Sequence, residues 1–166
     1  MMVTWDLGRR CNYDCTYCLS IHHNNYSRHR TLEECITVFE FIREYVDIYN
    51  EHRNTKFPTT INFTGGEPTV NPYFWDILEY IKNVDSSIKL SVTSNGAFNI
   101  KYIEHVQKYL NGITISYHCE ADQTLKDQVI NNILMISKTN VWMQVNLMLH
   151  SDYFEPMKYL HRYFLP

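Results

Sequence analysis

Three cysteines lie within eight residues near the start of the chain, at Cys11, Cys15 and Cys18. Such crowding is poor geometry for a disulfide framework, so the spacing CxxxCxxC indicates metal ligands instead. Three thiolates on one loop can hold three corners of an iron-sulfur cube and leave the fourth iron open to a ligand that is not protein. A zinc site is the alternative, because these cysteines with His22 or His23 would complete a closed tetrahedral arrangement.

A second motif, Gly65-Gly66-Glu67-Pro68, directly follows a strand-like run that ends at Thr64. Two glycines let the backbone approach a ligand closely, and Glu67 supplies an acceptor for an ammonium group. Ligands of open α/β sheets and βα barrels bind at the carboxyl ends of the strands, so we expect polar groups at other strand ends to converge here. Those groups are Thr93, Ser94, Asn95, Ser116 and Asn146.

The elements that must position these residues alternate between strand-like and helical patterns. We expect strands over 3–7, 60–64, 88–93, 113–118 and 141–149, and helices over 32–49, 71–82, 100–110, 122–137 and from about 155 onward. This alternation predicts an α/β fold with a parallel sheet, either doubly wound or curved as a partial (βα) barrel of about five βα units. A closed barrel of eight units takes about 250 residues, which is more than this chain has.

Two of the predicted helices have recognisable start signals. Thr31 and Glu34 have the form of a capping box before the first helix. Asn71-Pro72 is a suitable N-cap and first-turn pair for the second. Cys35 falls on the apolar stripe of the first helix, so we interpret it as a small buried hydrophobic residue and not as a metal ligand.

Residues of alternating polarity along the strands predict two different faces of the sheet. One parity is apolar and should pack on helices: Ile61, Phe63, Leu90, Val92, Ile113, Ile115, Val141, Met143 and Val145. The other parity carries small polar groups, which favours a concave face lined for a polar cofactor because burying them unpaired is costly. His118 shares the parity of Ser116 and lies nearer the rim, so it is the candidate catalytic, substrate-side residue; a satisfied structural histidine is the alternative.

Composition places few further limits on function. The formal net charge is −3, with 45% hydrophobic and 20% charged residues, which is ordinary for one soluble domain. No apolar run approaches the roughly 18 residues of a membrane span, so we expect a cytoplasmic protein without a membrane partner. A local basic zone at 22–30 would suit an anion, or is simply a solvated loop.

Taken together, these motifs resemble those of radical S-adenosylmethionine (radical SAM) enzymes. Cys11, Cys15 and Cys18, with the aromatic Tyr17, match the three-cysteine motif of that family, and Gly65 to Pro68 matches its Gly-Gly-Glu-Pro motif. Three later segments, at 93–96, 115–118 and 145–146, resemble the strand ends that many members use around the cofactor. The resemblance extends from Val3 to about Leu149.

The resemblance implies a 4Fe-4S cluster whose open iron is chelated by S-adenosylmethionine, with the ammonium received by Gly65, Gly66 and Glu67. Tyr17, Ser116 and Asn146 would contact the cofactor. One electron, from a reductant such as flavodoxin or ferredoxin, would yield a 5′-deoxyadenosyl radical that abstracts hydrogen from a peptide, a nucleotide or a glycyl-radical protein. In such enzymes the cofactor carries the hard chemistry and the protein supplies orientation.

Members of the family commonly have six βα units, whereas five are recognisable here. We therefore expect residues 1–166 to form a single radical SAM core domain, shortened at its C-terminus, whose open side is closed by a bulky substrate or a partner chain. Two other hypotheses stay open at this point. One is a zinc-stabilised module that binds nucleic acid or protein, and the other is a non-catalytic subunit of a split radical SAM enzyme.

Overall fold

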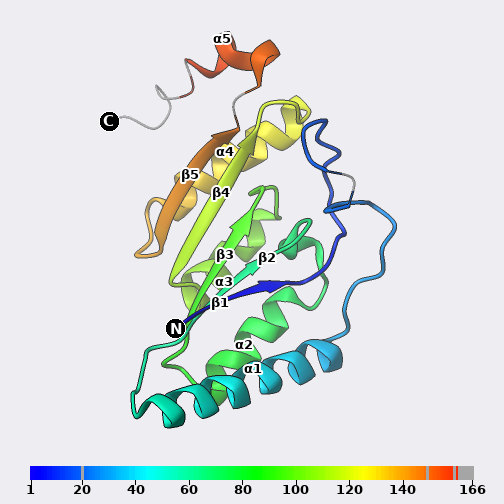
Figure 1. The fold of residues 1–166 in the computed structure, drawn as a ribbon. Coiled ribbons are helices and arrows are strands. Elements are labelled where there is room, and N and C mark those ends of the chain that lie inside the picture. Colours follow the sequence, from blue (N-terminus) through cyan, green and yellow to red (C-terminus); the bar gives the residue numbers. More distant parts are fainter. Residues whose placement is uncertain (20, 149, 159, 161–166) are drawn as a thin grey trace.

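The computed structural model describes residues 1–19, 21–148, 150–158 and 160. A single parallel sheet contains β1 (Met2–Asp6), β2 (Thr60–Thr64), β3 (Lys89–Ser94), β4 (Gly112–His118) and β5 (Trp142–Met148). Each strand pairs with the next one in the chain, in the order β1-β2-β3-β4-β5 (Figure 1). The sheet is curved and does not close, as expected for a partial βα barrel.

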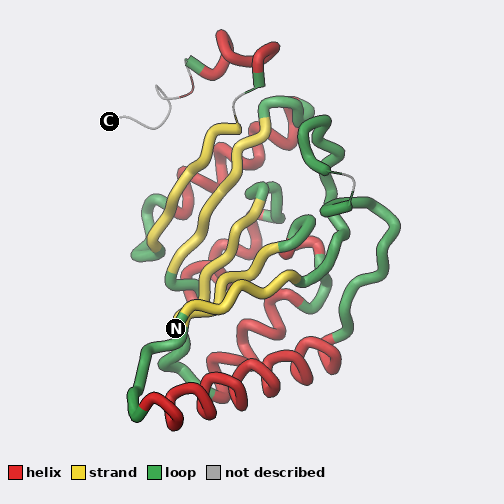
Figure 2. The backbone as a smooth tube through the Cα atoms, in the orientation of Figure 1, coloured by secondary structure: helices red, strands yellow, loops and turns green. Residues whose placement is uncertain are grey.

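The connecting helices are α1 (Leu32–Arg53), α2 (Phe74–Val84), α3 (Ile103–Tyr109) and α4 (Gln123–Ile136). Short 3-10 turns at Pro68–Val70, Ile100–Tyr102 and Ser151–Tyr153 precede α2, α3 and the short α5 (Phe154–Met157). Figure 2 shows α1 to α4 together on one side of the sheet, where each helix contacts the next. Among the residues that the structure describes, no helix covers the other side of the sheet.

The core lies between this sheet and its helices. The strand residues of the predicted apolar parity are buried: Ile61, Phe63, Leu90, Val92, Ile113 and Ile115 are at most 1% exposed. On β5 the residues of that parity are only partly buried against the same core. The opposite parity forms a polar layer, in which the Ser91 hydroxyl donates to Asn62 Oδ1 at 2.9 Å. The prediction of two unlike faces is therefore confirmed.

Helix α1 begins as its sequence predicts. Glu34 N donates to Thr31 Oγ1 at 3.2 Å, and Thr31 N donates to Glu34 Oε2 at 2.9 Å, which completes the capping box. Cys35 is buried, at 2% exposure, against the core. The helix continues beyond the expected residue 49 and ends at Arg53, and its C-cap Asn54 has a φ of 49°, the left-handed conformation that terminates helices.

The predicted start of the second helix at Asn71-Pro72 is wrong. Helix α2 begins at Phe74, and no side chain caps its Tyr73 N-cap. Asn71 instead accepts from Tyr73 N at 2.9 Å in a turn, and its amide donates to Arg30 O at 3.2 Å. Its side chain is therefore used to join this turn to the segment before α1.

The last predicted elements fall partly outside the described residues. Leu149, expected at the end of the fifth strand, and the stretch 161–166, expected in the last helix, belong to that part. Within the residues that the structure describes, no helix combines the length and the apolar character needed to cross a membrane.

Candidate active site at the carboxyl ends of the strands

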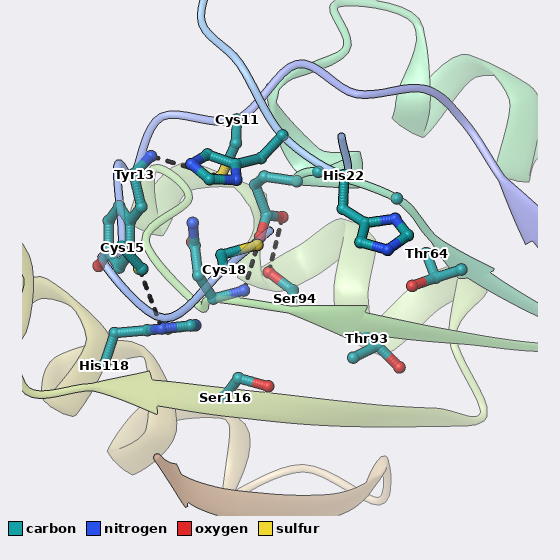
Figure 3. Close-up of a pocket in the computed structure, with 15 residues that line it drawn as sticks. Cys11, Tyr13, Cys15, Cys18, His22, Thr64, Thr93, Ser94, Ser116 and His118 are labelled. Carbon is teal, nitrogen blue, oxygen red and sulfur yellow. Dashed lines mark hydrogen bonds between the residues drawn. The ribbon is translucent and has the colours of Figure 1, made fainter. Parts of the chain in front are cut away.

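The cysteine loop, residues 7–31 between β1 and α1, passes over the carboxyl ends of the strands (Figure 3). A cavity of about 170 Å³ lies beneath it. Most of the predicted site residues line this cavity: Cys11, Cys15, Cys18, Gly65, Gly66, Glu67, Thr93, Ser94, Asn95, Ser116 and His118. Tyr13, His22, His23 and Thr64, which were not predicted as cofactor contacts, line it too.

Two predicted cofactor contacts do not line the cavity. Asn146 lies on β5 beside Ser116 in register, and its Oδ1 accepts from the Gln144 amide at 2.7 Å. Tyr17 belongs to the cysteine loop and is 37% exposed, with its hydroxyl directed at His118. Each therefore lies beside a residue that lines the cavity, Asn146 beside Ser116 and Tyr17 beside His118.

The glycine pair allows the turn after β2 to lie directly against the cysteine loop. A Cβ on Gly65 would come within 2.5 Å of Gly8 O, and one on Gly66 would come within 2.4 Å of Arg9 O. Gly66 N donates to Gly8 O at 2.8 Å, and Glu67 N donates to Arg10 O at 2.9 Å. The structure therefore gives these glycines a role that the sequence did not reveal, namely close packing of two backbones.

Glu67 joins the turns after β2 and β3. The residue is buried, at only 3% exposure. Oε1 accepts from Thr69 N at 3.0 Å, from Thr69 Oγ1 at 2.7 Å and from Ser94 Oγ at 2.8 Å, while Oε2 accepts from Asn95 N at 2.6 Å. Burial raises the pKa of this carboxyl, and these hydrogen bonds oppose that rise. Asn95 extends the link, because its amide donates to Asn12 Oδ1 at 2.7 Å.

His118, at the end of β4, faces the cysteine loop. Its Nδ1 lies 3.3 Å from Cys15 Sγ and within hydrogen-bonding contact of the Tyr17 hydroxyl. The Tyr17 ring stacks on the imidazole at an interplanar angle of 2°, and the Tyr13 ring meets it edge-on at 85°. Burial lowers the pKa of His118, which favours a neutral ring beside the sulfur.

Glu120 is a site residue that sequence reasoning missed. Its carboxylate accepts from Thr16 N at 2.9 Å and from Thr16 Oγ1 at 2.6 Å. The two residues are 104 positions apart in the sequence. Thr16 lies within the cysteine motif but Glu120 belongs to no recognisable motif, so only the fold brings them together.

The donor set at the loop fits an iron-sulfur cluster. All three cysteine sulfurs are free and border one cavity. Burial raises the pKa of Cys11 to about 11 and also raises that of Cys15, so both are thiols until a metal displaces their protons. In the described part of the chain, no three Cys, His, Asp or Glu side chains converge closely enough for one metal ion. A cluster does not require that convergence, because each thiolate binds a different iron.

Comparison with known proteins supports the same interpretation. A GTP 3′,8-cyclase of Crocosphaera subtropica is 28% identical over 153 residues, which cover 90% of this chain and 42% of that protein. The mycofactocin maturase MftC of Mycolicibacterium smegmatis is 27% identical over 89 residues, or 54% of this chain and 20% of the relative. The chain thus spans less than half the length of these curated relatives.

A solved structure has the same fold. The crystal structure of BtrN in complex with AdoMet and 2-DOIA superposes with a TM-score of 0.64 at 16% identity, over 91% of this chain and 57% of that one. The family description of the radical SAM superfamily matches residues 5–131, a range that contains the cysteine loop, the glycine turn and the ends of β3 and β4. The chain therefore belongs to the radical SAM superfamily, whose members are enzymes that use a 4Fe-4S cluster and S-adenosylmethionine.

Proposed function

We propose that Cys11, Cys15 and Cys18 each bind one iron of a 4Fe-4S cluster, and that S-adenosylmethionine binds at the fourth. The observation that carries this proposal is that the three sulfurs share a cavity with the glycine turn and the polar ends of β3 and β4. When bound and reduced, the cluster supplies the electron that cleaves S-adenosylmethionine to methionine and a 5′-deoxyadenosyl radical, which takes a hydrogen atom from the substrate.

The glycine turn is suited to the amino-acid end of S-adenosylmethionine. Gly66 N and Glu67 N already donate to the cysteine loop, so they are not available as donors to a ligand. Among the hydrogen bonds described for Glu67, one reaches Oε2, and its donor is Asn95 N. A carboxylate oxygen has room for a second donor, so Oε2 can receive one proton of the ammonium group.

The nucleoside end would follow the strand ends toward β5. Thr93, Ser94, Asn95 and Ser116 line the cavity beyond the glycine turn. Ser116 is paired in register with Asn146, so hydroxyl and amide groups continue onto β5. Tyr17 offers an exposed aromatic face on the cysteine loop for the adenine or ribose. These groups orient the ligand through hydrogen bonds and stacking.

The substrate would bind over the side of the sheet that carries no helices. The relatives named above act on a nucleotide or in the maturation of mycofactocin, and we propose a nucleotide, a peptide or a glycyl-radical protein as the substrate class. His118 stays the candidate for a substrate-side group, although its Nδ1 is engaged by the cysteine loop. A flavodoxin or ferredoxin would deliver the electron, and a partner chain would cover the edge at β5.

Anaerobic reconstitution tests this function. We expect the purified protein to bind four irons per chain, to absorb in the visible region, and to release 5′-deoxyadenosine when it is reduced with S-adenosylmethionine present. Cys15→Ala should abolish cluster assembly, whereas Cys35→Ala should retain it, because Cys35 lies in the core under α1. Bound zinc in a colourless protein that assembles no cluster would overturn the proposal. Release of the nucleoside only after a second chain is added would favour a subunit of a split enzyme.

A further inference from the structure

The cysteine loop is anchored before and between its cysteines. The amides of Gly66 and Glu67 hold Gly8 and Arg10, just before Cys11. Asn95, at the end of β3, holds Asn12, which follows Cys11. Glu120, two residues after β4, holds Thr16, which follows Cys15. Three successive strand ends therefore grip a single loop.

The grip on Thr16 uses both oxygens of one carboxylate. Thr16 N donates to Glu120 Oε2 at 2.9 Å, and Thr16 Oγ1 donates to Glu120 Oε1 at 2.6 Å. Thr16 lies inside the turn that joins two cysteines, which is closed by Cys18 N donating to Cys15 O at 3.1 Å. Fixing Thr16 therefore fixes the backbone from which both sulfurs project.

A carboxylate is the side chain best matched to this pair of donors. Each carboxylate oxygen accepts one bond, whereas glutamine has a single acceptor oxygen and would have to donate its NH₂ to the Thr16 hydroxyl, so both bonds would be between neutral groups. Bonds to an ionised acceptor are also about twice as strong as neutral ones. Burial is the main cause of the raised pKa of Cys15, and the negative charge of Glu120 adds to it, so the location of Glu120 is electrostatically unfavourable for thiolates. The two hydrogen bonds to the carboxylate stabilise the loop, whereas the effect of its charge on Cys15 does not favour metal binding.

We propose that Glu120 is a positioning residue that holds the Cys15–Cys18 turn in its ligand-binding conformation before any metal is bound. The effect of Glu120 on a bound cluster rests on the proposed function. The hydrogen bonds between Glu120 and Thr16 do not, because they join two residues of this chain.

The first test uses the metal-free protein. We expect Glu120→Gln to speed hydrogen-deuterium exchange at the Thr16 amide by about fivefold or more, because its bonds to Thr16 lose the charge of the acceptor, and Glu120→Ala to speed it further, because both acceptors are lost. Glu104→Gln is the matched control, since it removes the same charge from an exposed site on α3 and should leave that exchange unchanged. Far-UV circular dichroism of each variant checks that the sheet has formed. Exchange in Glu120→Gln equal to that of the wild type would overturn the proposal.

The second test measures retention of the cluster. After anaerobic reconstitution, we expect Glu120→Gln to lose iron to a chelator about fivefold faster than the wild type and Glu104→Gln, and to show a broadened electron paramagnetic resonance signal when reduced. A loop that exchanges faster while it keeps iron at the wild-type rate would refute the positioning role. Failure of the wild-type chain to assemble any cluster would refute the proposed function alone, because the exchange result in the metal-free protein would stand.

Discussion

Replacement of Gly66 by alanine should separate the glycine turn from the cysteine loop. The new Cβ would lie 2.4 Å from Arg9 O and 2.5 Å from Arg10 O, where ordinary contacts begin at 3.4 Å. The backbones must therefore move apart by about 1 Å, since 3.4 − 2.4 = 1.0. These neighbours are main-chain atoms, so no rotation of a side chain relieves the clash.

The cost of this movement follows from the contacts that it disturbs. Steric overpacking costs about 1–3 kcal/mol. The two backbone hydrogen bonds from Gly66 N and Glu67 N, at 2.8 and 2.9 Å, would be stretched out of range, at about 1 kcal/mol each. The loss of about 3–5 kcal/mol corresponds to a decrease in Tm of about 6–20 °C for a protein of this size.

Thermal unfolding of the metal-free protein, followed by circular dichroism, measures this decrease. Gly112→Ala is the matched control, because its Cβ would meet Trp142 Cε3 at 3.2 Å, and Trp142 is a side chain 60% exposed that can give way. We expect the control to stay within about 1 kcal/mol of the wild type. If Gly66→Ala unfolds within about 2 °C of Gly112→Ala, the close packing of these two backbones does not contribute to stability as argued.

Three further predictions follow from the site and its supports. Ser94→Ala should lower the free energy of unfolding by about 1–3 kcal/mol, measured by denaturant titration. The Ser94 hydroxyl donates to the buried Glu67 Oε1 at 2.8 Å and accepts from Gly96 N at 2.9 Å, and the variant loses both bonds. Arg28 and the capping bond hold the pKa of Glu34 at about 2, so the stability due to this carboxylate is present above its unfolded pKa of about 4.3 and is lost as the pH falls toward 2. The difference in Tm between wild type and Glu34→Gln should therefore shrink between about pH 5 and about pH 2; a constant difference would show that the charge does not matter. His118→Phe, which keeps a ring between the two tyrosines but removes Nδ1, should keep the fold by circular dichroism and change the reduction potential of the reconstituted cluster, because hydrogen bonds to the sulfurs tune that potential.

The sheet and the location of the site were predictable because they depend on short-range patterns. Alternation along β2, β3 and β4 identified the buried faces, and the rule that ligands bind at strand ends brought the cysteines and the glycine turn to one edge. The same sequence could not reveal how the loop lies on that edge. The contacts of Glu120 with Thr16 depend on a loop conformation without periodicity, and they join residues 104 positions apart.

Local signals were also misleading where a side chain had competing partners. Asn71 is a residue type favoured at N-caps. Its side-chain NH₂ nevertheless donates to Arg30 O, and its side-chain oxygen accepts from Tyr73 N. The glycine pair also packs against the carbonyls of residues 8–10, a partner that the sequence does not identify. In both cases the residue type is what the local conformation requires, and the partner is set by tertiary structure.

The anchors of the cysteine loop also set the order in which the protein can mature. Cys11, Cys15 and Cys18 are synthesised early, but the groups that hold their loop follow at residues 65–67, 95 and 118–120. Contacts of such long range form late in folding, because the intervening chain must be ordered first. Until β4 has joined the sheet, the turn between Cys15 and Cys18 lacks its contact with Glu120, and its thiols are more open to oxidation by the surroundings. If the proposed cluster binds here, we therefore expect iron delivery to follow assembly of the first four strands.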